Sequence, residues 1–146
     1  MNKKQWLGLG LVTVAAIGLA ACGNRASRKD SSDAKTDLKA AIVTDTGGVD
    51  DKSFNQSAWE GLQAWGKENG LSKDNGFTYF QSTSEADFAN NFSQAATNGY
   101  KLVYGVGYKL APAVTAAADE NADINYVIID SVVGDKKNVA SACLLY

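Results

Sequence analysis

Short apolar runs alternate with helical stripes along the chain from residue 40 onward. Residues 40–43, 77–80, 102–106 and 126–129 form continuous, mainly apolar runs, as in strands that are buried on both faces of a parallel sheet. Residues 139–146 begin a fifth run of this kind. Between the runs, apolar residues recur every three or four positions, which is the period of one helix face. The first of these stripes consists of Phe54, Ala58, Leu62 and Trp65, and the second of Phe88, Phe92 and Ala96.

Helix boundary signals accompany the stripes. Ser53, followed three residues later by a glutamine, predicts a capping box at the start of the first helix. Ser84 predicts the N-cap of the second helix. Gly70 and Gly99 are placed to end these two helices. A third, alanine-rich helix carries Pro112 in its first turn, where the missing N–H of proline costs nothing.

This alternation of strands and helices predicts an α/β fold, in which a Rossmann-like parallel sheet carries helices on both faces. In such sheets, ligands bind beyond the carboxyl ends of the strands. The residues that directly follow the strands are therefore the candidates for a functional site. They are residues 45–55, 81–84, 105–109 and 130–131.

The composition excludes several kinds of chemistry. The 146 residues carry 14 basic and 16 acidic side chains, so there is no basic field to hold nucleic acid. There is no histidine, which excludes Ser-His-Asp and Cys-His catalysis and histidine-bound zinc. The two cysteines, Cys22 and Cys143, are too few for a disulfide framework or a zinc cluster. We therefore expect no catalytic residues, no metal site and no cofactor.

The start of the chain has the pattern of a secretion signal. Two lysines precede an apolar run over residues 6–20, which is shorter than the roughly 20 residues that a membrane span needs. The run ends in Leu-Ala-Ala-Cys, which resembles the bacterial lipoprotein box. We predict a signal peptide over residues 1–21, lipidation at Cys22 and anchoring at the extracytoplasmic face of the cell membrane. Residues 22–39 lack aromatic side chains and are expected to form a flexible tether to the body at 40–146.

Two glycine-containing loops do not match nucleotide-binding motifs. A P-loop requires glycine immediately before its lysine, but Asp51 precedes Lys52. A carboxylate there repels a phosphate by about 4 kcal/mol at 4 Å in a partly polar environment. Gly105 and Gly107 begin a dinucleotide fingerprint, but position 110 is a leucine. We expect these two glycines to serve close backbone packing at a strand-to-helix turn.

The acidic residues of the first loop divide into two groups. Asp45, Asp50 and Asp51 lack the ligand spacing of an EF-hand. Asp50 and Asp51 precede a helix, where negative charge stabilises the positive end of the helix dipole. Asp45 ends a buried strand, where a carboxylate requires a partner. A sugar hydroxyl pair or an N–H of a base is a fitting partner.

Phe54 and Asn55 follow on the same loop. Phe54 belongs to the apolar stripe of the first helix, so packing in the core and stacking on a ligand remain equal alternatives. Asn55 lies off that stripe, and its amide both donates and accepts hydrogen bonds. A carboxylate, an aromatic ring and an amide on one loop suit a planar heterocycle with a hydroxylated tail.

The segment 41–56, AIVTDTGGVDDKSFNQ, followed by Trp-Glu-Gly at 59–61, resembles the basic membrane protein (BMP) family. It is most similar to the purine nucleoside receptor A-like lipoproteins of streptococcal type, which are substrate-binding proteins of nucleoside ABC importers. The resemblance runs from residue 1 to about residue 141. It implies a class I periplasmic-binding-protein fold, in which two α/β lobes hold a purine nucleoside between them and deliver it to a membrane permease.

The resemblance also implies roles for four residues. Phe54 stacks on the base, Asn55 and Asp45 form hydrogen bonds with the ligand, and Asp130 supplies a further acidic contact. Members of the family are more than twice as long as this chain. We therefore expect the chain to be a truncated product that contains the N-terminal lobe, with impaired binding. The alternatives are a small flavodoxin-like or phosphatase-like enzyme and a surface lipoprotein without a small ligand.

Overall fold

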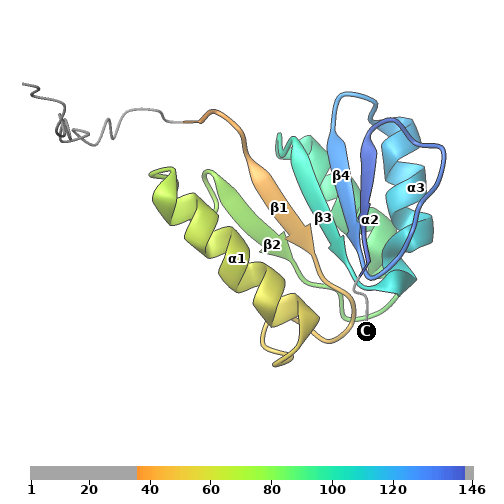
Figure 1. The fold of residues 1–146 in the computed structure, drawn as a ribbon, viewed down its shortest axis with the longest axis horizontal. Coiled ribbons are helices and arrows are strands. Elements are labelled where there is room, and N and C mark those ends of the chain that lie inside the picture. Colours follow the sequence, from red (N-terminus) through yellow and green to blue (C-terminus); the bar gives the residue numbers. More distant parts are fainter. Residues whose placement is uncertain (1–35, 144–146) are drawn as a thin grey trace, which may run out of the picture. The chain divides into compact units, whose positions relative to one another are not determined.

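The computed structural model describes residues 36–143, which form one α/β unit (Figure 1). Strands and helices alternate, and a single 3₁₀ turn, η1, precedes the last helix. The elements are β1 (Ala40–Val43), α1 (Phe54–Glu68), β2 (Phe77–Phe80), α2 (Asp87–Thr97), β3 (Leu102–Val106), η1 (Tyr108–Leu110), α3 (Ala111–Glu120), β4 (Asn125–Ile129) and β5 (Val139–Ala142). The four strands and three helices expected from the apolar pattern are all present, and the fifth run forms β5.

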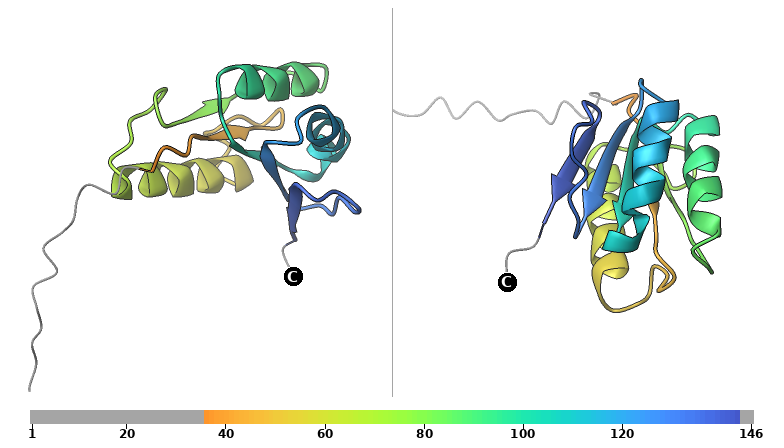
Figure 2. Two further views of the ribbon diagram at one scale, coloured as in Figure 1. Left: turned by 90° about the horizontal axis from the view of Figure 1, so that it is seen from above. Right: turned by 90° about the vertical axis from the view of Figure 1, so that its right-hand side faces the viewer.

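All neighbouring strands are parallel, in the order β2-β1-β3-β4-β5. Figure 2 shows α1 on one face of the sheet and α2 and α3 on the other. Alternate residues of each strand point to opposite faces, which produces two separate apolar clusters. On the α2/α3 face, the cluster includes Phe92, Val114 and Tyr126. On the α1 face, it includes Ile42, Leu62 and Phe77. The predicted Rossmann-like fold class is confirmed.

The helix ends agree with the predictions, but the predicted capping hydrogen bonds at the helix starts do not form. Gly70 and Gly99, which follow the C-cap residues Asn69 and Asn98 of α1 and α2, adopt φ values of +68° and +80°. This is the left-handed conformation that ends a helix. Ser53 forms no side-chain cap, so the predicted capping box is wrong. The Asp51 carboxylate takes that role, because its Oδ1 accepts the backbone N–H groups of Ser53 (2.8 Å) and Gln56 (3.1 Å).

The predicted cap at Ser84 is also wrong. Helix α2 begins at Asp87, two residues later than that cap implies. The Asp87 carboxylate reaches back and accepts the backbone N–H groups of Thr83 and Ser84, both at 2.9 Å. These hydrogen bonds hold the pKa of Asp87 below its usual value, the largest contribution being the hydroxyl of Thr83. A carboxylate therefore organises the start of both helices.

The predicted leader (residues 1–21), the lipidation site Cys22 and the tether up to residue 35 lie outside the described residues. Residues 36–39 contain no helix or strand. The carbonyl of Lys39 already accepts backbone hydrogen bonds from Lys101 and Leu102, so the chain joins the sheet one residue before β1. Within residues 36–143, no helix is long and apolar enough to cross a membrane.

Candidate functional site

The carboxyl ends of the strands meet at the lower edge of the sheet in Figure 1. Since every strand is parallel to its neighbours, the loops that follow β1, β2, β3 and β4 all begin at this edge. The candidate residues Asp45, Phe54, Asn55 and Asp130 lie on two of these loops and on the start of α1. The edge is therefore the place where sequence-distant polar groups converge.

Asp45 and Asn55 are in direct contact. The amide nitrogen Nδ2 of Asn55 donates to Oδ1 of Asp45 at 2.7 Å and to Oδ2 of Asp51 at 3.0 Å. The backbone N–H of Gly47 also donates to Oδ1 of Asp45, at 2.9 Å. Asn55 is 1% exposed, so two carboxylates on the loop are tied to one buried amide. The loop from Asp45 to the start of α1 is thus fixed at both ends.

The orientation of the Asn55 amide follows from its partners. Carboxylates only accept hydrogen bonds, so the nitrogen must face Asp45 and Asp51. The other side of the amide, Oδ1, is buried and has no hydrogen-bond partner within the described residues. A buried acceptor without a donor costs about 1–3 kcal/mol. Oδ1 of Asn55 is therefore a buried acceptor whose desolvation is not offset by a hydrogen bond within the described residues.

The carboxylates of Asp51 and Asp45 differ in how many of their hydrogen-bonding positions are occupied. Burial of Asp51 acts to raise its pKa, but hydrogen bonds from the backbone of Gln56, Ser53 and Asn55 outweigh it and lower the pKa. Both carboxylate oxygens of Asp51 accept hydrogen bonds from residues at the start of α1. This supports the helix-terminus interpretation of Asp51 and leaves Asp45 as the carboxylate with capacity for a ligand.

Asp45 keeps one oxygen free. Within the described residues, its Oδ2 accepts no hydrogen bond, and it faces the start of the loop after β3. A Cβ atom built on Gly107 lies 3.3 Å from this oxygen, and Gly107 has a φ of +106°. The positive φ favours glycine at this position, and a side chain there would also crowd the Asp45 carboxylate. The expectation of close packing is also confirmed at Gly105, where a Cβ atom lies 2.8 Å from Val114.

Phe54 is half-buried at the first position of α1. It packs against the α1-face cluster, which supports the core-packing alternative for part of its ring. The rest of the side chain is exposed, and Phe54 directly precedes Asn55 in the chain. The two alternatives are therefore compatible for this residue.

Asp130 follows β4 on the same edge, but it does not join the Asp45–Asn55 contact. Its backbone has a φ of +64°, and its N–H donates to the carbonyl of Ala142 at 2.8 Å. Strand β3 lies between β1 and β4, so Asp45 and Asp130 follow strands that are two spacings apart, about 10 Å. The two residues thus follow the strands on either side of β3.

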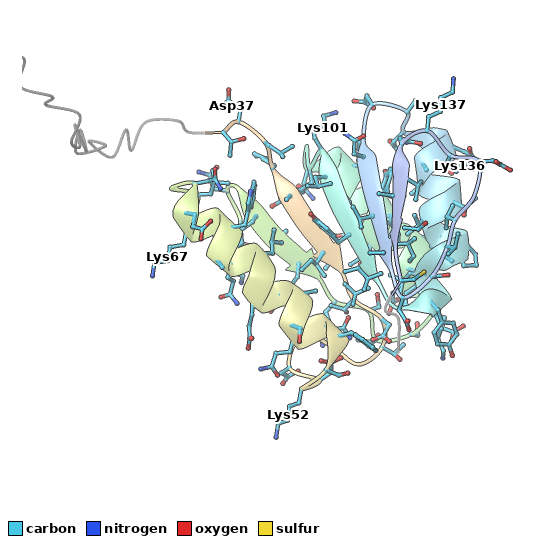
Figure 3. All side chains as sticks on the ribbon, in the orientation of Figure 1. Asp37, Lys52, Lys67, Lys101, Lys136 and Lys137 are labelled. Atoms are coloured by element: carbon cyan, nitrogen blue, oxygen red, sulfur yellow. The ribbon has the colours of Figure 1, made fainter. Side chains whose placement is uncertain are left out.

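Lys52, the residue that suggested a phosphate loop, does not face the site. It is exposed, and its side chain points away from the sheet at the lower end of α1 (Figure 3). Lys109 lies on η1 at the same edge, and its ammonium group is paired with Glu85 at 2.8 Å. The hydrogen bond from Lys109 to Glu85 raises the pKa of Lys109. Of these two lysines, Lys52 thus points away from the sheet and Lys109 is paired with a carboxylate.

Sequence reasoning missed a buried polar group behind the site. Thr44, Ser82 and Asn91 form hydrogen bonds with one another beneath the ends of β1 and β2. Asn91 lies between Phe88 and Phe92 on the buried side of α2. An amide within an apolar stripe was the available signal, because a buried polar side chain requires partners.

The comparisons with known proteins place these features in a family context. The family model described as "ABC transporter substrate-binding protein PnrA-like" matches residues 38–143. The chain is 52% identical to the "ABC transporter nucleoside-binding protein BmpA" of Lactococcus lactis subsp. cremoris over 96% of its length. It is 45% identical, over 97% of its length, to a "CD4+ T-cell-stimulating antigen" of Listeria monocytogenes. The chain spans about 40% of the length of these curated relatives.

Solved structures share the fold. A solute-binding protein of an ABC transporter system from Aeropyrum pernix K1 superimposes with a TM-score of 0.62 at 24% identity, over 71% of this chain and 28% of that one. A protein described as a putative lipoprotein fragment from Peptoclostridium difficile 630 gives a TM-score of 0.61 at 20% identity, over 71% of this chain and 83% of that one. At these identities, the likeness supports the α/β fold alone.

Proposed function

The chain belongs to the PnrA-like family of ABC transporter substrate-binding proteins, and we propose that it carries part of a purine nucleoside site. The observation that carries the proposal is the contact between Asp45 and Asn55 at the carboxyl edge of the sheet. Each side chain keeps one unused hydrogen-bonding atom, namely Oδ2 of Asp45 and Oδ1 of Asn55. A nucleoside offers the matching donors, because its ribose hydroxyls and base N–H groups both donate.

Phe54 supplies the aromatic surface next to these polar groups. We propose that its exposed part stacks on the purine, an interaction worth about 1–3 kcal/mol. Asp130 is proposed to contact the ligand from the loop after β4. The role is binding and not catalysis, and it places the protein upstream of an ABC permease that receives the nucleoside.

The charge of the edge favours a nucleoside over a nucleotide. Asp45 and Asp51 are close together around Asn55, and Lys109 is engaged by Glu85. A phosphate near either carboxylate is repelled by about 4 kcal/mol at 4 Å in a partly polar environment. Inosine is therefore expected to bind, and inosine 5′-monophosphate is not expected to compete with it.

The rest of the site is proposed to come from the part of the family's length that this chain does not span. If that part supplies about half of the contacts, binding by this chain alone is expected to be no tighter than about 100 μM. The test is a titration of the full chain in mild detergent with inosine, in which ligand-observed saturation-transfer NMR measures binding. Submicromolar affinity would show a complete site and would contradict this division of contacts.

Variants identify the site. Replacing Asp45 with Asn removes an acceptor that carries charge, so inosine binding is expected to weaken by at least about tenfold. The control is Asp50→Asn, which changes an exposed carboxylate on the same loop that forms no hydrogen bond within the described residues. Equal binding by both variants would remove Asp45 from the site. A chimera in which residues 38–143 replace the matching part of the lactococcal relative is expected to restore tight binding.

Membrane attachment is proposed to occur through lipid on Cys22, at the extracytoplasmic face. The pattern Leu-Ala-Ala-Cys after a short apolar run motivates the proposal. Replacing Cys22 with Ala is expected to abolish fatty-acid labelling and to release the protein from the membrane fraction. Unchanged labelling and retention would show that another feature anchors the chain.

A further inference from the structure

The backbone at the end of β2 is held by three buried polar side chains. Thr44, Ser82 and Asn91 are 0%, 1% and 7% exposed. The amide Nδ2 of Asn91 donates to Oγ of Ser82 at 2.9 Å and to the carbonyl of Gln81 at 3.3 Å. Buried polar groups that satisfy one another in this way fix a single local geometry. Helix α2 therefore holds the first two residues after β2 in place.

The same network reaches the loop that carries Asp45. The hydroxyl of Ser82 donates to the carbonyl of Thr44 at 2.7 Å, and the N–H of Ser82 donates to Oγ1 of Thr44 at 3.2 Å. Thr44 directly precedes Asp45. The position of Gln81 is thus fixed relative to the proposed ligand-binding loop by hydrogen bonds on both sides.

The Gln81 side chain lies over that loop. A Cβ atom built on Gly48 falls 3.0 Å from Nε2 and 3.3 Å from Oε1 of Gln81, so the carboxamide lies directly against this glycine. Gly48 also has a φ of +77°. The side chain of Gln81 is exposed, and its amide makes no hydrogen bond within the described residues. A donor and an acceptor are therefore held above the loop between Asp45 and Asp51 with their capacity unused.

We propose that Gln81 is a further ligand-contacting residue of this site and that Asn91 is its positioning residue. The inference rests on the proposed nucleoside site and extends it to the loop after β2. An amide both donates and accepts, so it suits a neutral polar group such as a ribose hydroxyl or the polar edge of a base. It gives the site a polar contact that the acidic residues of the first loop do not provide.

The test compares inosine binding by the full chain and its variants, again by saturation-transfer NMR. Gln81→Ala and Gln81→Glu change an exposed side chain, so both are expected to fold, which circular dichroism checks. Loss of one hydrogen bond is expected to weaken binding by about two- to tenfold in Gln81→Ala. Gln63→Ala is the matched control, because Gln63 is an exposed glutamine on α1, and it is expected to bind as the parent chain does.

A double-mutant cycle tests the role of Asn91. Asn91→Asp keeps the shape of the side chain and removes its donors, so it is expected to weaken inosine binding through displacement of Gln81. In the Gln81→Ala background, the same change is expected to have little further effect on binding. An equal effect in both backgrounds would show that Asn91 does not act through Gln81, and it would overturn the positioning role.

The outcomes separate this inference from the function on which it rests. If the parent chain binds inosine and both Gln81 variants bind equally well, the contact is wrong and the nucleoside site stands. If the parent chain shows no binding of inosine up to the solubility limit of inosine, the proposed function fails and the inference fails with it. Selective weakening in the Gln81 variants, with the Gln63 control unchanged, supports both.

Discussion

The two faces of the sheet are built from alternate residues of the same strands, but they are covered unequally. Helices α2 and α3 lie side by side on one face, and α1 covers part of the other (Figure 2). On the α2/α3 face, Val103, Tyr126 and Ile128 are at most 1% exposed. On the α1 face, the neighbouring residues Leu102, Tyr104 and Ile129 remain half-buried. Strands β3 and β4 thus each contribute to a closed core on one face of the sheet and to an open surface on the other.

The open part of the α1 face contains an apolar hollow of about 260 Å³. Its walls come from β1, β3 and β4 and from the side of α1 that carries Ala58, Gly61 and Trp65. The hollow lies along the face of the sheet and includes none of the polar residues of the carboxyl edge. The comparison therefore separates three regions: a closed core for stability, an open apolar face, and the polar edge that is proposed to bind the ligand.

Side-chain truncation on the two faces tests this difference most strongly. Phe92→Ala removes a 1% exposed ring whose centroid lies 5.9 Å from that of the Tyr126 ring. This change is expected to lower the free energy of unfolding by about 3–5 kcal/mol. Ile129→Ala removes a half-buried side chain beside an existing hollow and is expected to cost only about 1 kcal/mol. Urea unfolding followed by circular dichroism measures both. Equal losses would show that the α1 face is closed in solution.

Alkaline pH is expected to weaken the closed face specifically. Burial raises the pKa of Tyr126 to about 12, whereas an unfolded tyrosine ionises near pH 10. The neutral phenol is favoured in the fold, so its contribution is complete below pH 10 and is lost as the pH rises toward 12. The loss amounts to about 2–3 kcal/mol.

Tyr126→Phe isolates this effect. The hydroxyl of Tyr126 is buried and has no well-formed hydrogen bond within the described residues, with Asn121 as its polar neighbour, so its removal is expected to cost little at neutral pH. Urea unfolding between pH 9 and pH 12 is expected to show a smaller loss of stability in the variant than in the parent chain. Parallel pH profiles would mean that Tyr126 reaches solvent in the folded state.

These faces were largely predictable from the sequence, because strand and helix patterns are local. The run at residues 102–106 became β3 with the same bounds, and the stripes through Phe54 and Phe88 became α1 and α2. The predicted caps were wrong because Asp51 and Asp87, rather than the serines, accept the free N–H groups. A serine hydroxyl and a nearby carboxylate compete for the same donors, and the short-range pattern does not decide between them.

The candidate site was predictable only in part. The pairing of Asp45 with Asn55 spans ten residues, from the loop after β1 to the first turn of α1, and the sequence indicated that both residues lie close together in the chain. The bonds from Ser82 to Thr44 span 38 residues, and Asn91 reaches the network from another helix. Such contacts depend on which strands become neighbours in the sheet. These contacts could not be predicted from the sequence without knowing that β1 pairs with β2.

Two glycines on α1 offer a finer test, because Gly66 packs closely against a buried ring and Gly61 borders the open hollow. A Cβ atom built on Gly66 lies 2.3 Å from the ring of Phe77, which is 7% exposed and packs against Trp59. Gly66→Ala therefore forces the ring or the helix to move and is expected to destabilise the fold by about 1–3 kcal/mol. Thermal unfolding measures the change. A stabilised variant would show that α1 is loosely held over β2.

Gly61→Ala is expected to have the smallest effect and the opposite sign. Gly61 lines the hollow, and a Cβ atom built there meets nothing within 4 Å. Alanine restricts the unfolded chain and favours the helix, so a gain of about 0.5–1 kcal/mol is expected. The gain should not depend on protein concentration, because the added methyl group points into open space. A loss of stability that grows with concentration would instead show that a second copy covers this face, and it would remove the contrast between the two faces of the sheet.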